Sequence, residues 1–175
     1  MKRIVIAFIL MIGVFAFSQV DEIYKHNGEI IKGSVKKVTE YTVVFTYENE
    51  DAENTLSKYA VQKIIYGKSG RTEEVTEKVI VNGEADWENV VILEDKSYIA
   101  GLKKISEIKG KTGFISFHTG NTADNKATKK LKIEAAKLKC AFILLTSDKD
   151  INQSGFDGPR FGNVQAIRKG IAYSY

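Results

Sequence analysis

The side chains best suited to bind a transition metal or to act as a base are His26, His118 and Cys140, which lie in three separate segments. A tetrahedral zinc site takes several cysteine or histidine ligands, so a site here would need carboxylates to complete it. We therefore predict no metal site. His26, beside the Asn27-Gly28 turn, is expected to be solvated. His118 is expected to be a hydrogen-bonded loop residue, with ligand binding as the alternative.

Motifs for covalent catalysis or nucleotide binding do not occur in the chain. Ser34 and Ser154 each adjoin one glycine but lack the rest of a Gly-x-Ser-x-Gly elbow. Neither a Walker pattern nor Gly-x-Gly-x-x-Gly is present. A glycosidase-type acid pair depends on spatial separation and stays open, although the acidic run Glu48–Glu53 is typical of a solvated loop. The sequence predicts no catalytic residue, no cofactor and no enzyme, with an unrecognised hydrolase as the alternative.

Cys140 is the only cysteine, so it cannot close an internal disulfide bond. The domain must therefore be stable without the bridges that small exported domains often use. Apolar neighbours, Leu138 before it and Ala141–Leu145 after it, indicate a buried and inert side chain. The alternative is a reactive thiol or an intermolecular disulfide.

Residues 1–18 have the features of a secretory signal peptide. Lys2 and Arg3 precede an uncharged run from Ile4 to Phe17, and a small residue, Ser18, ends the segment. The apolar run is shorter than the roughly 20 residues that span a bilayer as a helix. We predict cleavage after Ser18, no transmembrane segment in the remaining chain, and a periplasmic or extracellular location in the cell envelope.

The charge of the chain argues against one class of partner. The formal net charge is +4, and removal of Lys2 and Arg3 lowers it to +2. A dedicated nucleic-acid binder has a strongly basic face. We therefore expect the partner to be an unknown protein or a component of the envelope.

The segment 19–67 is predicted to form a small module of β-strands. Asn27-Gly28 favours a type I′ hairpin turn, in which both central residues have positive φ. Gly33 in mid-strand indicates a bulge or bend. Residues 41–47 alternate between apolar and polar, 49–54 are expected to be a loop, and 61–66 a short closing strand.

This module resembles the Sm-like and SH3-like small barrels over about Asp21–Tyr66. The resemblance implies a strongly bent strand pair, a β-meander and a last short strand, and hence a bent, barrel-like sheet. It implies no activity. The positions on which it depends are Asp21, Ile23, Gly28, Ile31, Gly33, Val35, Val38, Val43, Val61, Ile64 and Tyr66.

Gly67–Glu74 is the best candidate for a boundary, and residues 75–175 are predicted to form an α+β module. Its sheet is expected to be mainly antiparallel, with one long helix on one face. Strands are predicted at 75–81, 87–93, 98–108, 140–146 and 164–173, and loops at 109–113 and 147–162.

The helix is predicted at about Asp124–Lys139. Its buried stripe is expected to comprise Ala127, Leu131, Ala135 and Leu138. Ile133 and Ala136 point away from this stripe, either on a flank partly covered by a loop or, as the alternative, on a partner surface. The outward arc is rich in lysine, which favours either a solvated face or a weak contact with an anionic surface. Its members are Lys126, Lys129, Lys130, Lys132, Lys137 and Lys139.

The segment from about Tyr98 to Tyr175 resembles the YbjQ-like family of small bacterial domains. The similarity rests on the helix Leu131–Leu138, an apolar strand, a long loop and the end Gly170-Ile171-Ala172-Tyr173. The chain departs from the family at Lys139-Cys140-Ala141, where members have a small Gly-Ala-Asn-like step. The metal-binding label of the family brings no ligand set that fits this chain.

These observations together predict an exported, non-enzymatic binding or interaction protein of the cell envelope. The alternative within the same fold is a ligand- or metal-sensing domain that uses the loops around His118 and at 147–162.

Overall fold

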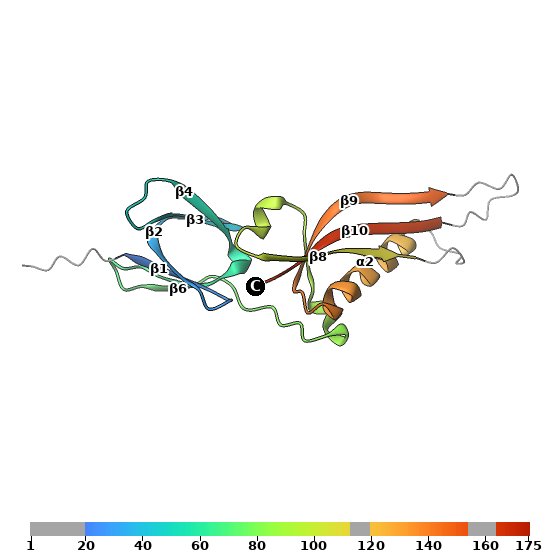
Figure 1. Cartoon of the computed structure of the whole chain (residues 1–175), viewed down its shortest axis with the longest axis horizontal. Helices are drawn as coiled ribbons and strands as arrows, with labels where there is room; N and C mark the ends of the chain where they lie inside the picture. The colour runs from blue at the N-terminus through green and yellow to red at the C-terminus, as the bar shows by residue number, and fades with distance from the viewer. Residues whose placement is uncertain (1–19, 113–119, 154–163) are drawn as a thin grey trace, which may run out of the picture.

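Two β-sheets follow one another along the long axis of the molecule in this computed structural model (Figure 1). The structure describes residues 20–112, 120–153 and 164–175. Over these ranges the fold is α+β, as the sequence predicts, and one α-helix, α2 (Gly120–Lys137), lies on one face of the second sheet. The predicted signal peptide, 1–18, lies outside the described residues.

The N-terminal sheet has six antiparallel strands in the order β4-β3-β2-β1-β5-β6. Strands β4 and β6 end this order, and no ladder joins them in the described part of the chain, so a closed barrel is not confirmed. The bounds are β1 (Asp21–Lys25), β2 (Ile30–Val38), β3 (Thr42–Tyr47), β4 (Glu53–Ser57), β5 (Val61–Ile65) and β6 (Thr72–Glu74). The core comprises Ile23, Ile31, Val43, Phe45, Leu56, Val61 and Ile64.

The hairpin between β1 and β2 is confirmed, but its turn differs from the prediction. Gly28 has a φ of 90°, whereas Asn27 is not among the described residues with positive φ. A type I′ turn needs positive φ at both positions. The amide of Lys25 instead donates to the carbonyl of Glu29, at 2.9 Å, so the loop is His26-Asn27-Gly28. His26 therefore becomes the first residue of the loop.

Gly33 marks a close approach between strands β2 and β3. A Cβ atom at this position would overlap the carbonyl oxygen of Thr46, so only glycine fits. The bulge itself lies a little further along, because the register between β2 and β3 shifts between Val35 and Lys37. The predicted bend is thus confirmed for this strand pair.

Two predicted segments of the first half are wrong in detail, and the proposed boundary segment contains a strand. Residues 53 and 54, expected in a loop, belong to β4, an edge strand too polar for an alternating pattern. The boundary segment Gly67–Glu74 contains β6, which pairs with β5. Val75–Val81 is not a strand: the Val75 amide still donates to the Gln62 carbonyl, but the Val79 amide donates to the hydroxyl of Tyr175. A side chain, and not a strand, pairs with the second half of this segment.

The C-terminal sheet has the strand order β7-β9-β10-β8. Strand β7 runs parallel to β9, and the other pairs are antiparallel. The bounds are β7 (Val91–Leu93), β8 (Lys103–Lys111), β9 (Phe142–Gln153) and β10 (Val164–Ser174). Short 3-10 helices, η2 (Glu84–Asn89) and η3 (Lys96–Ile99), occupy the starts of the predicted strands 87–93 and 98–108, and a third, η1 (Lys58–Ala60), precedes β5.

Two predicted loops of the second half are strands. Gly110, in the predicted loop 109–113, lies in β8 and packs against α2. A Cβ atom at this position would overlap the Ala127 carbonyl oxygen. Residues 147–153 extend β9 and pair with β10, although this stretch has no apolar pattern. The remainder of the predicted loop 147–162, from residue 154 on, lies outside the described residues.

Helix α2 begins and ends earlier than predicted, at Gly120 and Lys137. Ala127, Leu131 and Ala135 are fully buried, as expected. Leu138 is 45% exposed, because the helix has ended and Lys139 turns the chain with a φ of 55°. Ala136, expected on a flank partly covered by a loop, is fully buried, and η2 packs against the helix. Among the described helices, none is both long and apolar enough to cross a membrane.

Aromatic side chains join the two sheets. Tyr59 contacts Phe142 with 5.4 Å between ring centroids, and Phe142 contacts Tyr175 edge to face at 5.2 Å. Tyr41 packs on Tyr98 at 4.4 Å. The chain therefore ends at the junction between the sheets, where Figure 1 marks the C-terminus.

The close approach at Gly110 yields a test of the helix–sheet packing. Gly110→Ala should lower the free energy of unfolding by about 1–3 kcal/mol, because the added methyl group displaces α2 from β8. Urea denaturation measures the change. Gly83→Ala is the control, since a Cβ there meets no atom within 4 Å. Equal effects of the two substitutions would contradict the packing.

Candidate functional site

The residues that the sequence singled out for chemistry do not come together. Cys140 is fully buried, as predicted, and burial raises the pKa of its thiol. His118 lies outside the described residues. Within the described ranges, no three histidine, cysteine, aspartate or glutamate side chains are placed to share a metal ion.

His26 is buried, so the prediction of a solvated side chain is wrong. The residue is 9% exposed. Its backbone amide donates to the Ala60 carbonyl at 3.0 Å, which draws the loop onto η1. Its ring lies edge to face on Tyr175, with 5.0 Å between centroids. The longer hairpin loop and the junction therefore bury this histidine together.

Thr76 fixes which nitrogen of His26 carries the proton. The Thr76 hydroxyl lies 3.0 Å from the Lys58 carbonyl and 2.9 Å from the Val61 carbonyl, and it donates to these oxygens. Its single hydrogen is thus used, so it accepts from His26 Nε2, 3.1 Å away. The neutral ring then has an acceptor at Nδ1, which forms no hydrogen bond with a side chain of the described residues.

Lys78 adds a positive charge beside this histidine. Its ammonium group donates to the His26 carbonyl at 3.2 Å and lies 5.5 Å from the centre of the Tyr175 ring. Burial and, secondly, the Lys78 charge lower the pKa of His26 from its ordinary value of 6.5, and a hydrogen bond with the Thr76 backbone opposes this in part. The folded protein therefore favours the neutral imidazole.

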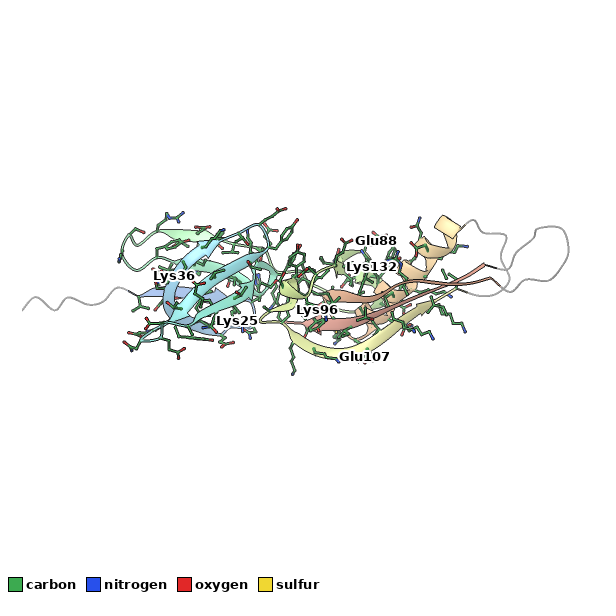
Figure 2. The ribbon with its side chains drawn as sticks, turned by 90° about the horizontal axis from the view of Figure 1, so that it is seen from above. Lys25, Lys36, Glu88, Lys96, Glu107 and Lys132 are labelled. Atoms are coloured by element: carbon green, nitrogen blue, oxygen red, sulfur yellow. The ribbon has the colours of Figure 1, made fainter. Side chains whose placement is uncertain are left out.

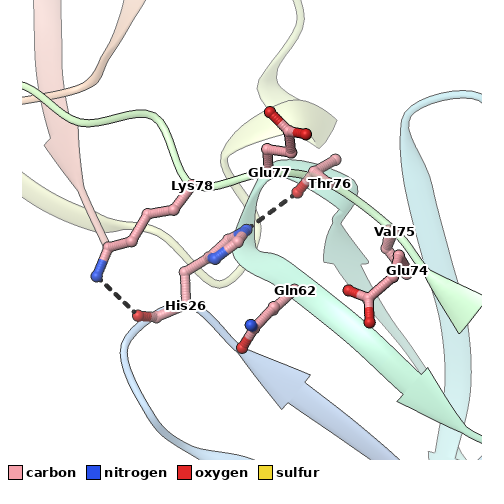
Figure 3. Close-up of a pocket in the computed structure, with 7 residues that line it drawn as sticks. All are labelled: His26, Gln62, Glu74, Val75, Thr76, Glu77 and Lys78. Carbon is pink, nitrogen blue, oxygen red and sulfur yellow. Dashed lines mark hydrogen bonds between the residues drawn. The ribbon is translucent and has the colours of Figure 1, made fainter. Parts of the chain in front are cut away.

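A hollow of about 710 Å³ lies beside His26, a size typical of sites for small ligands. Figure 3 shows the imidazole between Lys78 and Gln62, with Thr76 above it. Most of its wall is the extended segment that follows β6. The lining residues are His26, Gln62, Glu74, Val75, Thr76, Glu77 and Lys78.

The walls of this hollow, which we call the junction pocket, offer mainly acceptors. In the described structure neither Glu74 nor Glu77 forms an ion pair, and the side chain of Gln62 makes no hydrogen bond. All three side chains are exposed to solvent. Lys78 is the one cation among the lining residues.

A second candidate surface lies on the C-terminal sheet. Segment 103–139 has ten lysines and three acidic residues. The ammonium group of Lys130 donates to the Lys111 carbonyl at 2.9 Å, so this side of α2 adjoins edge strand β8. We call this surface the cationic flank; its exposed members are Lys109 and Lys111 of β8 and Lys126 and Lys130 of α2.

The three acidic residues of this segment have basic partners. Asp124 accepts two hydrogen bonds from Arg168, at 2.7 and 2.6 Å, which tie α2 to β10. Glu134 pairs with Lys137 at 2.8 Å, and Glu107 pairs with Lys104 at 3.2 Å. Figure 2 shows nitrogen-tipped side chains along the sheet edge that bears Glu107.

The other side of α2 is different because η2 covers it. The ammonium group of Lys129 lies 4.5 Å from the centre of the Trp87 ring. η2 also brings Glu84, Asp86 and Glu88, and Figure 2 shows Glu88 on the same side as Lys132. Positive charge is thus offset here and accumulates on the cationic flank.

Comparisons with protein-family models, with curated proteins and with solved structures found no match to this chain. The geometry of the junction pocket and of the cationic flank is therefore the basis for assigning a function.

The lowered pKa of His26 predicts how pH changes stability. Well above pH 6.5 neither the folded nor the unfolded state binds a proton at this residue. Below it the unfolded chain binds the proton more readily, so stability falls with falling pH until the folded pKa is passed. His26→Gln should lower the free energy of unfolding by about 1–3 kcal/mol at pH 7.5, and by less at pH 5.

Urea denaturation at the two pH values measures this difference. The chain has two histidines, so His118→Gln is the matched control for the other one. If His26→Gln and wild type lose the same stability between pH 7.5 and pH 5, the described environment of His26 is contradicted.

Proposed function

We propose that this protein is an exported, non-enzymatic binding protein of the cell envelope, periplasmic or extracellular, which contacts an anionic membrane surface through the cationic flank. The observation on which this depends is the arrangement of the lysines. They are exposed around the edge of a sheet, while the acidic residues of the same segment are already paired. The sequence of residues 1–18 supports export.

Electrostatics is the expected basis of this contact. A lysine held near an anionic membrane contributes about 1 kcal/mol, so several together give a measurable attraction. Apolar insertion is not favoured, since the one tryptophan, Trp87, is half-buried and its ring is contacted by Lys129. The contact should therefore be reversible and should weaken as salt increases.

Anionic phospholipid headgroups are the partner that this surface fits best. The binding groups are compact ammonium charges on flexible stems, which suit mobile phosphate groups. The mature formal charge near +2 and the export signal both disfavour nucleic acid.

Co-sedimentation with lipid vesicles tests the proposal. Protein beginning at Gln19 should bind vesicles of phosphatidylcholine with 30% phosphatidylglycerol at about 25 mM salt, and should dissociate at about 300 mM. Lys109→Glu with Lys130→Glu should weaken binding at least tenfold, since four units of charge change on the cationic flank.

The matched control changes the same charge on the N-terminal sheet. Lys36→Glu with Lys37→Glu alters two exposed lysines of β2, and Figure 2 shows Lys36 at the other end of the molecule from α2. This variant should retain most of the binding. An equal loss in both variants, or no binding to anionic vesicles at low salt, would contradict the proposal.

A further inference from the structure

We propose that the junction pocket binds a cationic nitrogen group, a guanidinium or a primary ammonium, held by the Glu74 carboxylate, the Gln62 amide oxygen and His26 Nδ1. This site is separate from the cationic flank and involves other residues. The inference combines a hollow of suitable size, a set of acceptors on its wall and a buried nitrogen that lacks a donor.

The strongest of these observations concerns His26. The residue is only 9% exposed, and its Nε2 is bonded to the Thr76 hydroxyl, whereas Nδ1 has no side-chain partner among the described residues. The hydroxyl of Thr76 is itself oriented by two backbone carbonyls, so the ring cannot reverse its roles without breaking that arrangement. Nδ1 is thus held as an acceptor, and a buried acceptor is stabilised when a donor meets it.

The other groups add negative charge and further acceptors. Figure 3 shows Gln62 and Glu74 projecting on the same side of the segment that follows β6, whereas Glu77 projects on the other side. The hydrogen bond from the Val75 amide to the Gln62 carbonyl fixes the spacing of the backbone that bears them. Glu74 and Gln62 are therefore the principal wall, and Glu77 contributes at the rim.

Lys78 does not make the pocket a site for anions. Its ammonium group is turned toward the His26 carbonyl and the face of the Tyr175 ring. Two carboxylates against one such lysine leave the lining net negative. A group with several N–H donors and a positive charge matches acceptors of this kind.

Two sources supply this chemistry: a free amine, or an arginine or lysine side chain of a peptide. Titration followed by ¹H–¹⁵N NMR distinguishes them. The probes are spermidine, argininamide and the blocked tripeptide acetyl-Gly-Arg-Gly-amide, with the citrulline tripeptide as the neutral match. The protein is expressed with its own N-terminal segment and purified from the envelope fraction.

Binding of a cationic probe should shift the side-chain amide signals of Gln62 and the backbone signals of Thr76 and Lys78. The citrulline peptide should bind at least tenfold more weakly than the arginine peptide. If spermidine and argininamide bind as tightly as the arginine peptide, the natural ligand is a free amine. If only the arginine peptide binds, the ligand is a side chain of a protein or peptide. Either result supports the site.

Glu74→Gln tests the carboxylate directly and should weaken binding at least tenfold. Glu53→Gln is the matched control, because β4 is at the opposite end of the strand order from β6. Binding should also weaken once the pH falls below the lowered pKa of His26, since protonation of the ring replaces the Nδ1 acceptor by a donor. The titratable or charged groups that face His26 are Lys78, Tyr175, Glu74 and Glu77.

Several binding results would overturn the proposal. They are an absence of binding for every cationic probe at 10 mM, equal binding of the arginine and citrulline peptides, and tighter binding of acetate or phosphate than of the cations. Equal weakening by Glu74→Gln and Glu53→Gln would also exclude the pocket. None of these results depends on the vesicle experiment, because that experiment tests a different surface.

Discussion

Aromatic packing between the two sheets is the constraint on which the other features of this protein depend. Tyr59 reaches across from η1 to Phe142 of β9, and Phe142 in turn contacts Tyr175. A backbone hydrogen bond of 2.8 Å from the Ser57 amide to the Ala100 carbonyl crosses the same junction. Because Tyr175 also contacts His26 and accepts from the Val79 amide, it fixes both the loop and the connecting segment that form the junction pocket. The pocket thus lies beside the contact between Tyr175 and the first hairpin.

The C-terminal sheet shows how a helix rich in lysine is held in place. Small residues allow a close approach, since Gly110 of β8 and Ala127 of α2 meet backbone to backbone. The paired charges of Asp124 and Arg168 fix the first turns of α2 on β10. Burial of Leu131 and Ala135 stabilises the remainder. With its inner face occupied in this way, α2 presents its lysines outward, and the acidic η2 offsets them on one side alone.

Local sequence patterns predicted the elements that bury an alternating or helical stripe. The strands around Ile23, Val43 and Ile143 and the helix around Leu131 were predictable, because each presents one apolar face. Predictions were wrong where glycine or polar residues belong to a strand. Gly110 lies in β8 because α2 approaches it closely, and residues 147–153 lie in β9 because they pair with β10. Neither cause can be recognised from the residue types alone. The junction pocket could not be predicted either. Gln62, Thr76 and Lys78 form no motif, and the burial of His26 depends on Tyr175, far away in sequence.

Native-state hydrogen exchange, read residue by residue, tests the central claim that the junction makes the two sheets one cooperative unit. The slowest amides of β1 and β5, such as Ile23 and Ile64, should report the same free energy of opening as Ile143 and Leu144 of β9, with the same dependence on denaturant. If the amides of the N-terminal sheet open at a distinctly lower free energy while those of the C-terminal sheet stay protected, the sheets are independent, and the junction cannot hold the pocket in the described form.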